Sequence, residues 1–164
     1  MPYTTADIRN IALVGQAGAG KTLLAEALLA QSGAIRSKGS LARGTTVCDF
    51  DPQEKDLLHS LDAAICGFET QGRRVNVIDT PGYPDFLGRS LVALEAVETA
   101  VIVVSAVNGI EPMTQRLRAQ AIEILKHGPG NGRWREFRAL GLELFAQMLG
   151  HLEREEAVVV RLDC

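Results

Sequence analysis

A glycine-rich segment near the N-terminus has the residue types needed to hold a polyphosphate. It reads Gly15-Gln-Ala-Gly-Ala-Gly-Lys-Thr22, which fits the P-loop pattern of a glycine, four residues and Gly-Lys-Thr. Glycines let the backbone wrap around phosphate oxygens, so that consecutive N–H groups point at them. Lys21 would reach the β- and γ-phosphates, and the Thr22 hydroxyl would ligate Mg²⁺. The predicted nucleotide-binding residues of this loop are Gly15, Gln16, Ala17, Gly18, Ala19, Gly20, Lys21 and Thr22.

A second motif, Asp79-Thr-Pro-Gly82, follows the apolar run Val75-Asn-Val-Ile78. An aspartate at the C-terminal end of a strand beside a P-loop can hold the magnesium shell, directly or through water. Gly82 can bring a backbone N–H to a γ-phosphate, because no side chain stands in the way. Alone, the tetrapeptide would be a turn with a capping aspartate, and its pairing with the P-loop favours the functional interpretation. The predicted nucleotide-binding residues here are Asp79, Thr80, Pro81 and Gly82, and the predicted metal ligands are Thr22 and Asp79.

Hydrolysis by such a site would depend on positioning and on charge stabilisation. Lys21, magnesium and the backbone amides of Gly20 and Gly82 are the groups expected to stabilise the charge that develops on the phosphates. Lys21 and Gly82 are therefore the catalytic residues that these two motifs predict.

Alternating buried strands and amphipathic helices place both motifs in an α/β fold. The apolar run Ile11-Ala-Leu-Val14 ends at the P-loop, as a buried strand should. The link Gln71-Gly72-Arg73 suits a hairpin that adds one antiparallel edge strand. We therefore predict a three-layer P-loop NTPase sandwich with a mostly parallel sheet. The predicted helices span residues 20–32, 86–98 and 113–126, and the predicted strands span residues 11–14, 64–70, 74–79 and 101–106.

The last quarter of the chain differs in character from the rest. A breaker cluster, His127-Gly-Pro-Gly-Asn-Gly-Arg133, separates a predicted nucleotide-binding domain (1–126) from a tail (127–164). The tail is predicted to hold an amphipathic helix over residues 134–156 and a short strand over residues 157–160. Within the domain, residues 33–62 show no sustained period, and a loop of that length is usually functional or mobile.

Composition excludes several classes of protein. With 46% hydrophobic and 23% charged residues in 164, the chain is expected to be soluble and globular. A formal net charge of -3 gives no overall attraction to nucleic acid or anionic membranes, so we expect neither direct DNA binding nor membrane association. The N-terminus lacks the pattern of a signal peptide. Three cysteines without metal-ligand spacing indicate free thiols, and a cytoplasmic location is expected.

Four segments, in order, resemble elongation factor G, a translational GTPase. They are residues 9–22, residues 44–64 with Gln53-Glu-Lys55, Asp79-Thr-Pro-Gly-Tyr-Pro-Asp-Phe86, and Val103-Val-Ser-Ala-Val-Asn-Gly-Ile-Glu-Pro112. The similarity reaches about residue 125 and is nearest to the elongation-factor-G-like branch. It implies that the nucleotide is GTP or GDP, that the chain is a GTP-binding module with a role in protein biosynthesis, and that the ribosome is a partner.

The chain departs from this family within the nucleotide site. Gly18 stands where the main factors usually carry an aspartate, which removes a carboxylate near the phosphates. Tyr83 stands where the family has the histidine that positions the attacking water, so Tyr83 is a candidate catalytic residue only by position. A phenol can hydrogen-bond a water, but it lacks the geometry and charge of an imidazole. Hydrolysis is therefore expected to be slow or to need another group.

The first switch segment, which by this resemblance is residues 33–62, is also rewritten. The family's Arg-Gly-Ile-Thr corresponds to Leu57-Leu-His-Ser60, and its threonine ligates magnesium in the triphosphate state. Ser60 keeps a hydroxyl and is a candidate metal ligand, with a polar loop serine as the alternative. His59 is interpreted as a loop histidine rather than as a replacement catalyst.

The family's base-reading motif, Asn-Lys-x-Asp, does not follow Lys126, so the domain is interpreted as truncated. If residues 157–160 re-formed the missing strand, Asp163 would take the place of the aspartate that binds guanine. Without that residue, the choice between guanine and adenine is open. Three functions therefore remain: a translational GTPase module, a degenerate P-loop protein that acts through binding alone, and an ATP-using P-loop enzyme.

Overall fold

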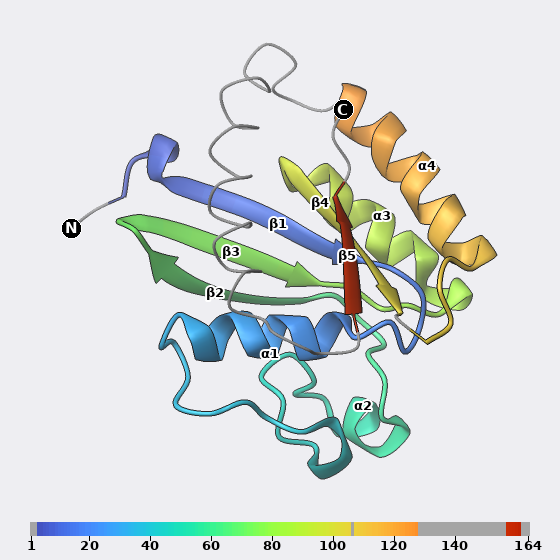
Figure 1. Cartoon of the computed structure of the whole chain (residues 1–164), viewed down its shortest axis with the longest axis horizontal. Helices are drawn as coiled ribbons and strands as arrows, with labels where there is room; N and C mark the ends of the chain where they lie inside the picture. The colour runs from blue at the N-terminus through green and yellow to red at the C-terminus, as the bar shows by residue number, and fades with distance from the viewer. Residues whose placement is uncertain (1–2, 106, 128–156, 162–164) are drawn as a thin grey trace.

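The computed structural model describes residues 3–105, 107–127 and 157–161, and these contain one five-stranded sheet (Figure 1). The strand order is β2-β3-β1-β4-β5, in which β3, β1 and β4 are parallel and the two edge strands are antiparallel to their neighbours. The predicted mostly parallel sheet is therefore confirmed. The strands are β1 (Ile8–Val14), β2 (Ala64–Thr70), β3 (Arg73–Asp79), β4 (Thr99–Ser105) and β5 (Ala157–Arg161).

Helices cover both faces of the sheet, which gives the predicted three layers (Figure 1). One helix follows β1 and packs on one face, and two helices pack on the opposite face. All three were predicted, although the second is shorter than expected: it begins one residue later, after a 3₁₀ turn over Pro84–Phe86, and ends three residues earlier, at Glu95. The helix predicted over residues 134–156 lies outside the described residues. The helices are α1 (Lys21–Gln31), α2 (Pro52–Leu57), α3 (Leu87–Glu95) and α4 (Pro112–His127).

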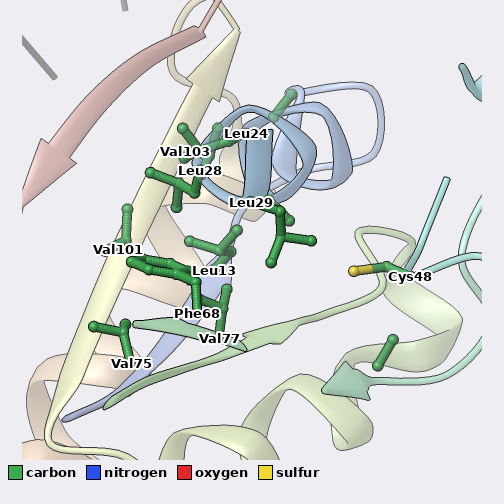
Figure 2. Packing of buried hydrophobic residues seen from close by; sticks show 13 residues of the cluster. Leu13, Leu24, Leu28, Leu29, Cys48, Phe68, Val75, Val77, Val101 and Val103 are labelled. Carbon is green, nitrogen blue, oxygen red and sulfur yellow. The ribbon is translucent and has the colours of Figure 1, made fainter. Parts of the chain in front are cut away.

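Two apolar clusters hold the layers together. On one face, Leu24 and Leu28 of α1 pack with Leu13 of β1 and with valines of β3 and β4 (Figure 2). On the other face, Leu94 of α3 and Ala121 of α4 pack on the alternate side chains of β1 and β4. Because successive side chains of a strand point to opposite faces, the runs of apolar residues in β1 and β4 supply both clusters.

The hairpin between β2 and β3 is closed by a two-residue turn. Gln71 and Gly72 have φ angles of 48° and 75°, the positive values that a type I′ turn needs at both central positions. The register pairs Thr70 with Arg73 and Ala64 with Asp79. The predicted antiparallel edge strand is confirmed. The parallel pairing of Leu13 with Asp79 places the end of β3 at the P-loop edge of the sheet.

The strand predicted over residues 157–160 is present as β5, but its direction contradicts the interpretation of Asp163. β5 runs antiparallel to β4, so that Ala157 pairs with Ser105 and Arg161 pairs with Val101. The chain therefore leaves β5 at the end of the sheet opposite to the P-loop. A base-reading residue would have to follow a parallel strand, at the same edge as the P-loop. Asp163 itself lies outside the described residues.

The first switch segment is folded around two buried glutamates. Glu54 is buried in α2, and its carboxylate accepts hydrogen bonds from the backbone N–H groups of Leu61 and Asp62 at 2.9 and 3.2 Å. Glu26 of α1 is only 1% exposed, and it accepts from the backbone N–H groups of Gly39 (2.6 Å) and Val47. The expected irregular loop is therefore held to the domain through its backbone donors.

Replacing Glu26 by glutamine should lower the free energy of unfolding by about 1–3 kcal/mol. The glutamine amide has one oxygen, so its NH₂ group would face one of the two N–H donors and leave that donor unpaired. Urea unfolding of the nucleotide-free protein measures this loss. The matched control is Glu95→Gln at the exposed end of α3, which should change stability by less than about 0.5 kcal/mol. Equal stability of the two variants would contradict the role given to Glu26.

Candidate functional site

The P-loop connects β1 to α1 in a conformation that requires glycine. At Gly15 an added Cβ would lie 2.3 Å from the carbonyl oxygen of Val103, so no side chain fits there. Gly18 and Gly20 have φ angles of 72° and 94°, in the left-handed region that other residues rarely adopt. Glycines at these positions therefore satisfy the geometry of the turn, and α1 begins directly after them with its N-terminal amides near the loop.

Lys21 is the buried cation of the loop. Its side chain is 6% exposed, and its ammonium donates hydrogen bonds to the carbonyl oxygens of Gly15 (3.0 Å) and Gln16 (2.9 Å). Burial lowers the pKa of Lys21 to about 8, against a smaller opposing effect of Asp79. A phosphate beside this ammonium would raise the pKa of Lys21 again, because an opposite charge favours the protonated form.

Asp79 and Thr22 form the second half of the site. The Thr22 hydroxyl donates to Asp79 Oδ2 at 2.6 Å, which leaves the lone pairs of that hydroxyl free for a cation. Asp79 is 1% exposed, and its other oxygen, Oδ1, is buried without a hydrogen-bond partner among the described residues. Burial raises the pKa of Asp79 to about 6, with a smaller contribution from the neighbouring carboxylate of Asp49, against the lowering effects of the Thr22 hydrogen bond and the Lys21 ammonium. A buried carboxylate oxygen without a partner is what a bound cation would satisfy.

The rest of the Asp-Thr-Pro-Gly motif is fastened to the P-loop strand. The Thr80 hydroxyl donates to the carbonyl oxygen of Leu13 at 2.7 Å, and Ser90 of α3 donates to the carbonyl oxygen of Pro81 at 3.0 Å. Gly82 lies directly against the loop, since an added Cβ would be 2.5 Å from both the Ala17 amide nitrogen and Lys21 Nζ. The two predicted motifs are therefore brought together at one edge of the sheet.

Replacing Gly82 by alanine should weaken nucleotide binding at least tenfold. The new methyl group would displace the Lys21 ammonium or the Ala17 amide, both of which are groups expected to face phosphate oxygens. Fluorescence titration with a labelled nucleotide measures the change. Gly88→Ala is the matched control, because Gly88 has no atoms near its added Cβ and lies in α3. Equal affinities of the two variants would contradict the close approach of Gly82.

Two contacts at the site were not predicted from the sequence. Thr114 of α4 donates to Gln16 Oε1 at 2.5 Å, and both residues are buried. Asp49 is also buried and accepts from Thr46 and Ser60, at 2.9 and 2.8 Å. Thr46 and Asp49 are only three residues apart, whereas the contacts of Thr114 with Gln16 and of Ser60 with Asp49 follow no local pattern, because the fold brings those residues together.

Ser60 lies within the first switch segment, and Tyr83 contacts that segment through His59. The Ser60 hydroxyl donates to Asp49 Oδ1, and Asp49 is close enough to Asp79 to raise the pKa of that carboxyl. The ring of Tyr83 is 42% exposed and contacts the imidazole of His59. The roles predicted for Ser60 as a metal ligand and for Tyr83 in catalysis stay predictions.

In the part of the chain that the structure describes, neither a separate metal-ion cluster nor a membrane-spanning helix is present. No group of three or more His, Cys, Asp and Glu residues there could hold a metal ion on its own. No helix within the same described ranges is long and apolar enough to cross a membrane. Cys48 and Cys66 are free cysteines, one buried and one partly buried. The P-loop edge is thus the site that the described residues support.

A glycine loop between strand and helix, with a buried lysine and an aspartate at the end of the neighbouring strand, defines a P-loop nucleotide-binding domain. The comparison with known families specifies the class further. Residues 6–125 match the family "Elongation factor Tu GTP binding domain", and the chain belongs to that family. Membership implies binding of GTP and GDP, so the nucleotide expected from the sequence is borne out.

Two named relatives are similar to the chain over most of its length. The chain is 39% identical over 136 residues to the elongation factor G-like protein of Mycobacterium tuberculosis, covering 77% of this chain and 19% of the relative. It is 39% identical over 120 residues to elongation factor G 2 of Streptomyces coelicolor, covering 73% and 17%. A crystal structure of a protein from Thermus thermophilus matches with a TM-score of 0.69 and 34% identity, over 87% of this chain and 22% of that chain. The chain thus spans about a fifth of the length of the relatives it matches.

Proposed function

We propose that the chain binds Mg²⁺·GTP at the P-loop edge and hydrolyses it slowly, as the GTP-binding module of an elongation-factor-G-like translational GTPase. Residues 1–126 are assigned to this module, and residues 127–164 to a tail that lies beyond the family match. The ribosome is the proposed partner. Support comes from the names of the relatives, which are an elongation factor G-like protein and elongation factor G 2.

The observation that carries the proposal is the pair of buried charges at the site, Lys21 and Asp79. Lys21 is a buried cation that donates to two carbonyl oxygens and lies near Asp79, and Asp79 keeps one buried oxygen without a partner among the described residues. Anionic phosphates and a divalent cation would satisfy both groups at once. Thr22 and Asp79 are the residues proposed to hold the cation, and Ser60 is proposed to join them in the triphosphate state.

In the proposed reaction, the protein positions the phosphates and stabilises developing charge. The Lys21 ammonium and the amides of Gly20 and Gly82 would bind oxygens of the transferred phosphoryl group. Bound magnesium supplies neutralisation of the charge on the phosphate oxygens. The first switch segment would close over the nucleotide, and its contacts with Glu26 place it beside α1 before closure.

Titration with fluorescent GTP and GDP tests this proposal, with and without Mg²⁺ and in competition with unlabelled ATP. Saturable binding that depends on Mg²⁺ and resists ATP supports a guanine-nucleotide module. Equal competition by ATP would contradict guanine selection and leave a module that holds phosphates only. Absence of saturable binding would contradict the proposed function as a whole.

A second candidate, a binding module without turnover, is favoured by one observation. The residue after Gly82 is a tyrosine whose ring is packed on His59, and a phenol is a weaker acceptor for the attacking water than an imidazole. Radiolabelled GTP hydrolysis over hours separates the two candidates. Binding without release of phosphate would favour this second candidate.

A further inference from the structure

Two aromatic rings from the two segments beside the phosphate site are packed on each other. His59 belongs to the first switch segment, and Tyr83 directly follows Gly82. Their ring centroids are 4.5 Å apart and the ring planes meet at 60°, which is an edge-to-face contact. Gly82 lies against Lys21 Nζ and the Ala17 amide, and Tyr83 is its next residue along the chain, so the Tyr83 end of the pair is joined directly to the proposed phosphate site.

The imidazole of His59 is oriented by its own backbone. Its Nδ1 atom lies 3.0 Å from the carbonyl oxygen of Leu57. A carbonyl oxygen can only accept, so Nδ1 must carry the hydrogen of this bond. In the neutral ring, Nε2 then presents its lone pair, as in histidines whose tautomer is fixed by a hydrogen bond to the other nitrogen. The ring therefore offers one hydrogen-bond acceptor of fixed direction.

Phosphoryl transfer to water needs a group that accepts a hydrogen bond from the water and holds it in line with the γ-phosphate. Backbone amides and the Lys21 ammonium are donors and do not serve this purpose. The side chain of Tyr83 points to His59 with its ring, and the imidazole Nε2 is the stronger acceptor of the two groups. The contact thus holds an acceptor of the first switch segment, His59 Nε2, against the side chain of the residue that follows Gly82.

We propose that His59 orients the attacking water through Nε2, with the ring of Tyr83 fixing the imidazole in place. This role rests on the proposed GTP-binding function and concerns its hydrolytic step. The water oxygen forms a bond to the γ-phosphorus, and the bond from that phosphorus to the β–γ bridging oxygen breaks. Both hydrogens of the water leave with inorganic phosphate as H₂PO₄⁻, and His59 gains no proton over the reaction.

Single-turnover hydrolysis of GTP with Mg²⁺, measured beside the affinity for fluorescent GTP, tests this role. His59→Ala should lower the hydrolysis rate at least tenfold, while Kd changes by less than about twofold. Added imidazole should restore part of the lost rate. His59→Gln, whose amide lies near the place of Nε2, should keep more of the rate than His59→Asn, whose amide lies near Nδ1. Tyr83→Phe, which keeps the ring, should likewise retain more than Tyr83→Ala.

His127→Ala is the matched control for loss of a histidine. His127 ends α4, about 20 Å along the helix from the Thr114 contact with Gln16, and its replacement should leave hydrolysis unchanged. A wild-type rate in His59→Ala would overturn the proposal, as would a loss that imidazole and glutamine both fail to restore. A rate that falls in parallel with affinity would show a structural role and would also overturn it. If the unmodified chain binds GTP without hydrolysing it, this proposal fails and GTP binding stands; if it binds no GTP, the proposed function fails as well.

Discussion

Replacing Lys21 by alanine is expected to lower the affinity for GTP at least 100-fold. The Lys21 ammonium donates hydrogen bonds to two carbonyl oxygens of the P-loop, and it is buried beside Gly82. Hydrogen bonds to charged groups contribute about 1.5–3 kcal/mol each, and each 1.4 kcal/mol is a factor of ten in affinity. Loss of two bonds to phosphate oxygens therefore corresponds to at least two orders of magnitude. Titration with fluorescent GTP at pH 7.5 measures the effect.

This loss should not arise from unfolding. Burial lowers the pKa of Lys21 to about 8 from 10.5, so in the nucleotide-free protein its charge opposes folding at all pH values below about 8. That opposition fades between pH 8 and 10.5, as the folded protein releases the proton first. Removing the charge should thus leave the free energy of unfolding unchanged or higher at pH 7.5. Lys55→Ala, at an exposed position of α2, is the control, and equal GTP affinity in the two variants would contradict the role of Lys21.

The sequence predicted the parts of this domain that are encoded locally. The P-loop needs glycines at Gly18 and Gly20 because the turn itself demands positive φ there, while Gly15 is needed because the carbonyl oxygen of Val103 leaves no room for a side chain. Strands β1 and β4 were evident as apolar runs, since both of their faces are buried. The hairpin turn was evident in Gln71-Gly72.

Features that depend on distant residues were missed. The helix α2 went unpredicted because it is only six residues long, too short to show a period, although Asp51 and Glu54 form a capping box that marks its start. The contacts of Glu26 with Gly39 and Val47 join α1 to a loop, and no spacing in the sequence reports them. The direction of β5 was equally hidden, since an apolar run fits a parallel or an antiparallel strand alike.

The contact of His59 with Tyr83 is another feature that depends on residues distant in the sequence, and it was not predicted. From the sequence, His59 was a polar residue in an irregular segment, and Tyr83 was a departure from the family at a single position. Each substitution alone removes a feature of the site. The fold brings the two rings into contact, which neither position reveals in the sequence. A catalytic interpretation of either residue therefore requires the structure.

Replacing Asp79 by asparagine is expected to have opposite effects on stability and on binding. The carboxyl of Asp79 has a pKa of about 6 in the folded chain, mainly because of burial, against 3.8 as its ordinary value. Below pH 3.8 the group is neutral in both states and costs nothing. Between pH 3.8 and 6 the unfolded chain loses the proton while the folded chain keeps it, so stability falls as the pH rises. Above pH 6 the full cost applies, about 3 kcal/mol at 1.36 kcal/mol per pKa unit.

The asparagine variant should therefore be more stable than the unmodified chain by about 1–3 kcal/mol at pH 7.5 without nucleotide, and the difference should shrink toward zero near pH 4. Its Mg²⁺-dependent gain in GTP affinity should fall at least tenfold, because a neutral amide replaces the proposed metal-binding carboxylate. Urea unfolding in EDTA at several pH values and GTP titration with and without Mg²⁺ measure the two effects. Asp85→Asn, which changes an exposed carboxylate in the following 3₁₀ turn, should alter neither stability nor binding.

A less stable Asp79→Asn protein at pH 7.5 would show that the buried carboxylate is already compensated within the chain. If the variant is more stable but keeps the full Mg²⁺-dependent gain in GTP affinity, Asp79 does not bind the cation. Thr22 and the phosphates would then be its ligands.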